Sequence, residues 1–196
     1  MGLAMYKLCK TEESSKRQRD IENKLLKLML EKHYDDITVS EICIAADIPR
    51  KSFYRYFDGK EGVKQALLVH TLEDFDGFKL ARNDRNLKLR EEFEGFFIFW
   101  KSKKEFLEAF DKSGLIGLLV ESSTTYAMNE FGNVKQYLAD SADRERLLAY
   151  QFVICGLMTM MINWYRSGFV DSIPNLSRTA TKLITKPLFE NLTRTE

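Results

Sequence analysis

Four basic side chains and several hydroxyl groups lie within eleven residues of this chain, between Arg50 and Lys60. The segment holds one acid, so its local charge is +3, although the 196-residue chain has a net charge of only +1. Arginine can pair with guanine through two hydrogen bonds, and lysine, serine and tyrosine can hold phosphates. The combination favours a surface that binds double-stranded DNA, and the alternative is a solvated helix face without a partner.

The residues around this basic segment predict a helix-turn-helix. Thr38 and Glu41 have the spacing of a capping box, which starts a short helix. A turn at 47–49 follows, and its proline suits the first position of a second short helix over 50–57. Phe53 and Phe57 can pack inward from that second helix, which leaves its basic side chains facing outward. In a helix-turn-helix, such a second helix lies in the major groove.

The whole chain is predicted to be all-α, with about nine helices. It has only three prolines, and the alternation typical of strands is hard to find. A first helix is expected over 14–33, with Ile21, Leu25 and Leu28 on its inner face, and residues before it are expected to fray. The longest helix is expected to end at Gly168, and the last is expected over 175–192.

The stretch from Thr38 to Val63 resembles the TetR family of transcriptional regulators. It has a capped helix, an Ala-Ala turn, the pattern Tyr-x-x-Phe from Tyr54 to Phe57, and a Lys-Glu pair that opens the next helix. With the preceding basic helix, the match covers about 50 residues in register. Asp47 stands where the family usually has glycine, and aspartate tolerates the left-handed conformation better than most residues. Pro49 replaces a frequent serine and removes a hydroxyl that could contact phosphate.

The resemblance implies a DNA-binding domain over residues 1–60, a connecting helix to about residue 79, and a ligand-binding and dimerisation domain over 80–196. It implies a homodimer that binds a palindromic operator and responds to an unknown small-molecule effector. The expected role is repression, and activation is the alternative. For Arg55, the alternative to a DNA contact is an ion pair with an acidic residue on a neighbouring helix. Arg17 and Arg19 are expected to be solvent-exposed on their own helix and to make no DNA contact. The expected DNA contacts are Thr38, Ser40, Arg50, Lys51, Ser52, Tyr54, Arg55, Tyr56 and Lys60.

A stripe of aromatic residues supplies a candidate ligand pocket. Plain core packing is the alternative, because aromatic residues at successive turns face one interior, and a pocket also needs concavity and polar groups. A cavity behind the stripe would distinguish the two interpretations. The candidate pocket residues are Phe93, Phe96, Phe97, Trp100, Phe106, Phe110 and Tyr126.

The segment from Phe152 to Tyr165 is apolar around most of its helical circumference, so both of its sides need cover. We expect the core on one side and a second subunit on the other, in a self-complementary interface. The alternative is a central helix of a monomer. The candidate interface residues are Phe152, Cys155, Met158, Ile162 and Tyr165.

Other function classes lack their usual residues. Neither histidine, His33 or His70, has a cysteine or acid at metal-ligand spacing, and the motifs of phosphate loops, dinucleotide folds and serine hydrolases are missing from the sequence. We therefore expect no enzyme, metal or cofactor. With no apolar run of about 18 residues and three scattered cysteines, we expect a cytoplasmic protein without a membrane partner. A ligand-independent adaptor of the same fold remains an alternative function.

Overall fold

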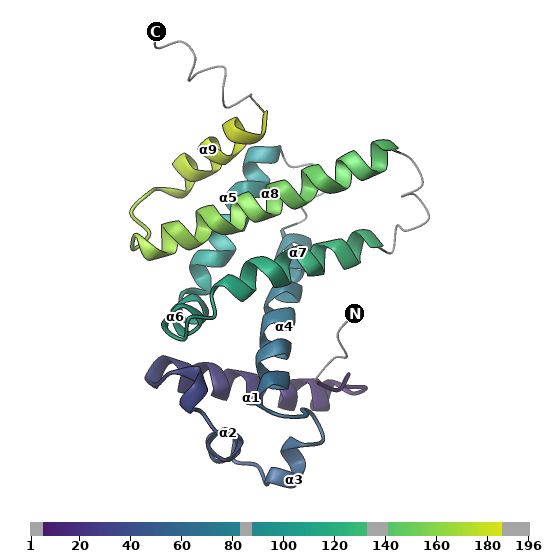
Figure 1. Cartoon of the computed structure of the whole chain (residues 1–196), viewed down its shortest axis with the longest axis vertical. Helices are drawn as coiled ribbons and strands as arrows, with labels where there is room; N and C mark the ends of the chain where they lie inside the picture. The colour runs from purple at the N-terminus through teal and green to yellow at the C-terminus, as the bar shows by residue number, and fades with distance from the viewer. Residues whose placement is uncertain (1–5, 83–87, 133–140, 186–196) are drawn as a thin grey trace. The chain divides into compact units, whose positions relative to one another are not determined.

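The computed structural model describes residues 6–82, 88–132 and 141–185, and over these ranges it consists of nine α-helices with one short 3₁₀ helix (Figure 1). The all-α prediction is therefore confirmed. The chain divides into two compact units, one of residues 1–73 and 105–122, the other of residues 74–104 and 123–196. Helices α4 (Lys60–Ala81) and α7 (Gly117–Gly132) contribute to both. The functional division at residues 60 and 80 stays a prediction.

The first unit is organised around α1 (Glu12–Glu31), which contacts α2 (Val39–Ala45), and α2 in turn contacts α3 (Arg50–Phe53). Ile21 and Leu25 of α1 are fully buried as predicted. The third inner position of that helix is Met29, and the predicted Leu28 is only half-buried. The inner face therefore runs closer to a four-residue spacing than the sequence analysis assumed.

The predicted capping box at the start of α2 is present. The Thr38 hydroxyl accepts a hydrogen bond from the Glu41 amide at 3.3 Å, and the Glu41 carboxylate accepts one from the Thr38 amide at 2.9 Å. Lys32 also donates to this carboxylate. The hydrogen bonds from Lys32 and Thr38 lower the pKa of Glu41 to about 2, so the cap stays charged at any ordinary pH.

The second short helix is shorter than predicted, because α3 ends at Phe53 and residues 54–56 form a turn. Phe53 and Phe57 are nevertheless fully buried with their ring centroids 5.6 Å apart, as their spacing predicted. The aromatic pair therefore anchors the turn as well as the helix, and α4 begins three residues later.

Asp47 has the left-handed backbone that the turn requires, with a φ of 49°. We expect Asp47→Val to destabilise the protein by about 1–2 kcal/mol, because a branched Cβ crowds the backbone in this conformation. Asp47→Gly is the matched control and should change the free energy of unfolding by less than about 0.5 kcal/mol, since glycine adopts this conformation without strain. Urea denaturation of both variants measures the difference. Equal stability of the two variants would contradict a strained turn.

The second unit contains α5 (Leu89–Ser102), α8 (Ser141–Arg166) and α9 (Ile173–Thr185), and α9 packs along α5. Helix α8 is the longest described helix and ends at Arg166. Gly168 follows with a left-handed φ of 75°, as expected for a glycine that terminates a helix. Helix α9 begins two residues before the predicted Asn175, with Pro174 in its first turn, where no amide donor is needed. The end predicted for it near residue 192 lies outside the described residues. The remaining helix, α6 (Lys104–Lys112), lies almost wholly in the first unit.

Candidate functional site

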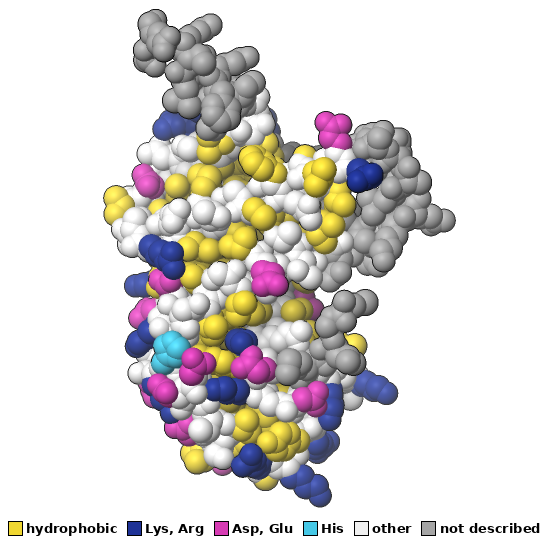
Figure 2. Space-filling model, in the orientation of Figure 1, with side chains coloured by type: hydrophobic (Ala, Val, Ile, Leu, Met, Phe, Trp, Pro, Cys, Tyr) yellow, Lys and Arg dark blue, Asp and Glu magenta, His cyan; other side chains and the backbone are white. Residues whose placement is uncertain are grey.

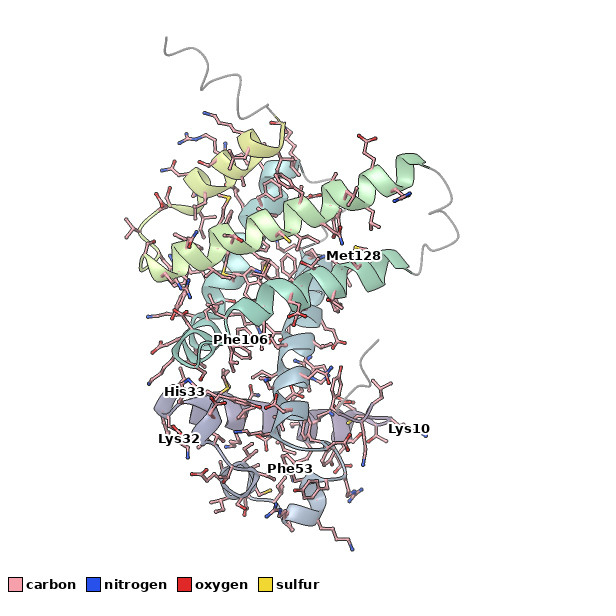
Figure 3. The ribbon with its side chains drawn as sticks, viewed as in Figure 1. Lys10, Lys32, His33, Phe53, Phe106 and Met128 are labelled. Atoms are coloured by element: carbon pink, nitrogen blue, oxygen red, sulfur yellow. The ribbon has the colours of Figure 1, made fainter. Side chains whose placement is uncertain are left out.

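The outer side of the helix-turn-helix presents the basic residues that the sequence analysis selected. Arg50, Lys51 and Arg55 are exposed, and Tyr54 is 41% exposed. Phe53, labelled in Figure 3, is buried on the opposite side of α3. Figure 2 shows Lys and Arg side chains on the part of the first unit where α2 and α3 lie. The sequence thus predicted correctly which face of α3 is polar and which is core.

Arg50 and Tyr54 form a pair on this exposed face. The guanidinium Nη2 of Arg50 donates to the Tyr54 hydroxyl at 3.3 Å, and its central carbon lies 5.8 Å from the centre of the tyrosine ring. The two residues are one helical turn apart, so the contact is set by helix geometry alone. The contact restricts the side-chain conformation of Arg50. It uses one guanidinium donor, so the remaining N–H groups are available to bind the edge of a base.

The remaining candidate contacts have mixed environments. Thr38 and Ser40 are exposed at the start of α2, but the Thr38 hydroxyl is engaged in the cap. Ser52 and Tyr56 are half-buried. Among the described residues, no acid forms an ion pair with Arg55, so the alternative of a helix-to-helix pair receives no support. Arg17 pairs with Asp20 on its own helix at 3.6 Å.

Lys60 has a structural environment that the sequence did not indicate. Its ammonium donates to the backbone carbonyls of Tyr34, Asp35 and Ile37 at 3.0–3.1 Å, and it lies 4.7 Å from the centre of the Tyr34 ring. An ammonium has three donors, so these bonds use all of them. Lys60 thereby ties the start of α4 to the 3₁₀ helix Tyr34–Asp36. A phosphate contact by Lys60 stays a prediction, and it requires exchange of at least one of these bonds.

Residues 6–10, the described part of the segment before α1, are held in place, contrary to the expectation that this segment frays. Tyr6 forms an isolated antiparallel bridge with Phe57, and the Lys7 amide donates to the Tyr56 carbonyl at 2.9 Å. The side-chain amide of the buried Gln18 donates to the Lys7 carbonyl at 3.0 Å. Local sequence contains no signal for the pairing with Tyr56 and Phe57, because these partners are more than 45 residues away on the chain.

The comparison with family models agrees with this geometry. Residues 24–67, which run from α1 through the helix-turn-helix into α4, match the model described as bacterial regulatory proteins, tetR family. Residues 24–67 therefore form a TetR-type region. The match supports a DNA-binding regulator of the TetR type.

Solved structures support the same fold for most of the chain. The fatty acid degradation regulator FadR from Bacillus halodurans aligns with a TM-score of 0.59 and 16% identity, covering 88% of this chain and 96% of its own. The dihydroxyacetone kinase operon activator DhaS aligns with a TM-score of 0.54 and 17% identity, covering 86% and 93%. At these identities the likeness concerns the fold alone. The sequence has no significant match among curated proteins.

The candidate ligand residues fall in different compact units. Phe106 and Phe110 of α6 stack at 4.3 Å within the first unit. The α5 residues belong to the second unit, where their rings contact one another and Trp164 at centroid distances of 5.3–6.3 Å. Tyr126 donates to the Asp76 carboxylate at 2.7 Å. The close ring contacts favour core packing for Phe96, Phe97 and Trp100, and burial favours it for Phe93.

The candidate interface residues on α8 differ in exposure. Phe152 is 75% exposed, whereas Met158 and Ile162 are buried against this chain's own core. Cys155 and Tyr165 are half-buried. The burial of Met158 and Ile162 arises because the inner face of α8 continues to Trp164, whose ring meets the α5 aromatics. The exposed large apolar side chains of α8 therefore lie in its N-terminal half, at Leu148, Tyr150 and Phe152.

Helix α8 also carries a feature that a search for uninterrupted apolar runs overlooks. By length and average composition, Leu147–Arg166 is apolar enough to cross a membrane, and 28% of the tested window is buried. Figure 2 shows hydrophobic side chains exposed over α8 and α9. A groove of about 380 Å³ lies between these helices and is lined by Glu145, Leu148, Ala149, Phe152, Val153, Leu183 and Ile184.

Proposed function

We propose that this protein is a cytoplasmic repressor that binds a palindromic operator as a homodimer and is released by a small-molecule effector. The observation that carries the proposal is the exposed surface of α3 and of the turn after it. There Arg50, Lys51, Tyr54 and Arg55 lie over the buried Phe53 and Phe57. Arginine and lysine on a recognition helix supply both base reading and phosphate binding. A short helix held this way enters a major groove without losing its support.

The apolar surface of α8 and α9 supports the dimer. Leu148 is 65% exposed, and Leu183 and Ile184 of α9 border the same groove as Phe152. An exposed apolar surface of this kind needs cover, and a second copy covers it symmetrically. A dimer also presents two recognition helices, which is what two half-sites about 34–36 Å apart require.

A ligand-independent regulator of the same fold is a second candidate. The close contacts among the α5 aromatic rings favour it, because rings that fill one another's space leave less room for an effector. Isothermal titration of apolar and aromatic small molecules, with operator release as a second readout, distinguishes the two candidates. Binding that also lowers operator affinity supports the effector.

Selection of bound sequences from random duplex DNA tests the proposed function. We expect enrichment of a palindrome whose half-sites are one helical turn apart. Arg50→Ala should relax the preference at one base position in each half-site, at a cost of about 1–3 kcal/mol in discrimination. Lys51→Ala should weaken binding to operator and scrambled DNA alike if Lys51 holds a phosphate. An enriched site without symmetry contradicts the dimer, and no enrichment contradicts operator recognition.

A further inference from the structure

The N-terminal arm, Tyr6–Lys10, brings a cation to the end of the recognition helix. The Lys7 ammonium donates to the backbone carbonyl of Tyr54 at 3.0 Å. Tyr54 is the residue that caps the C-terminal end of α3. The side chain of Lys7 is exposed, and its backbone is fixed on both sides by Tyr56 and Gln18. The cation therefore starts from an immobilised backbone next to the helix that would enter the groove.

The size of α3 places phosphates close to this cation. Four helical residues span only about 6 Å along the axis, whereas the major groove is about 12 Å wide. When a helix this short lies in the groove, both of its ends face sugar–phosphate walls. Lys51 is the candidate phosphate contact near the N-terminal end. At the C-terminal end lie Arg55 and, from outside the helix-turn-helix, Lys7.

The bonding of Lys7 leaves it able to serve a phosphate. One of its three donors is used by the Tyr54 carbonyl, so two remain. Lys60 differs, because its three donors are all occupied by carbonyls. Holding Lys7 on a fixed backbone also lowers the conformational entropy that a flexible lysine loses on binding. The arm thus offers a preorganised cation at a place where the anionic backbone is expected.

We propose that Lys7 binds a DNA phosphate beside the C-terminal end of α3, so that the N-terminal arm forms part of the DNA interface. The inference rests on the proposed operator binding. The Tyr6–Phe57 bridge and the Gln18 bond are backbone anchors for the arm, and the Lys7 side chain is the contact. If the only role of Lys7 were its hydrogen bond to the Tyr54 carbonyl, its replacement would leave DNA affinity unchanged.

The salt dependence of DNA binding tests this proposal on the full-length protein. Lys7→Met removes the charge and keeps the backbone bonds of the arm, and Lys7→Arg keeps the charge. Lys27→Met is the matched control, since Lys27 is exposed on α1 nine residues beyond Gln18, about 13 Å along the helix. Fluorescence anisotropy measures the affinity of each variant for the selected operator between 50 and 200 mM salt, and circular dichroism verifies folding.

We expect Lys7→Met to reduce the slope of log affinity against log salt by about one, so that its affinity falls about three- to fourfold less across this range. Lys7→Arg and Lys27→Met should retain the wild-type slope. A folded Lys7→Met variant with the wild-type slope overturns the proposal, and so does an equal loss in Lys27→Met, which would indicate net charge alone. If the wild-type protein binds no DNA, the proposed function fails first, and that result is distinct from either of these.

Discussion

Phe152→Glu is expected to convert the protein to monomers and to lower its operator affinity by about a hundredfold or more. Phe152 is 75% exposed beside the groove between α8 and α9, so a carboxylate there costs the single subunit little. In the proposed dimer the same carboxylate is desolvated twice, once in each subunit, without a partner. Separate subunits lose the effective concentration that links two half-sites, which is worth 10²–10⁴ in affinity. Sedimentation equilibrium and anisotropy measure the two effects.

Val170→Glu is the matched control for this experiment. Val170 is also an apolar residue of the second unit, it is 80% exposed, and it does not line the groove. The variant should stay dimeric and bind the operator normally. A dimeric Phe152→Glu variant, or two variants that dissociate equally, would show that the dimer forms elsewhere. Met158 is unsuitable for this test, because its side chain is 2% exposed and a charge there would damage the subunit itself.

His70→Leu is expected to destabilise the first unit by about 3 kcal/mol. Nδ1 of His70 on α4 lies 2.8 and 3.0 Å from the two carboxylate oxygens of Glu22 on α1, so this nitrogen carries a proton and donates. The Glu22 carboxylate is 1% exposed. Removing a hydrogen-bond donor from a buried carboxylate costs about 1–3 kcal/mol or more, because the charged group remains desolvated with one bond fewer. Chemical denaturation followed by circular dichroism measures the loss.

The double variant Glu22→Leu/His70→Leu provides the control for this prediction. Replacing both partners by apolar residues removes the desolvated charge, so we expect the double variant to recover most of the stability. A double-mutant cycle then gives the coupling between the two residues. A His70→Leu variant as stable as the wild type would contradict a role for the pair in joining α1 to α4. Tyr6 of the arm contacts the His70 ring edge-on at 5.5 Å, so the same measurement also reports on arm packing.

The sequence predicted the helix-turn-helix and the composition of its exposed face. The Thr38 cap and the inward pair Phe53 and Phe57 followed from residues within a few positions of one another. The left-handed Asp47 followed from the resemblance, because the family usually has glycine at that position. Capping, turn conformation and helical periodicity are local effects, and a single sequence records them directly. The resemblance to the TetR family could be recognised, and the all-α fold class predicted, because both depend on these local patterns.

Contacts between distant parts of the chain were decided only by the tertiary structure. The bonds of Lys60 to three carbonyls, the pair of Glu22 with His70 and the seating of Lys7 on Tyr54 join residues 23 to 48 positions apart. The burial of Met158 likewise depends on which face of α8 the second unit covers. Periodicity specifies that a helix has an apolar face, but packing decides which neighbour covers it and which donors are already used.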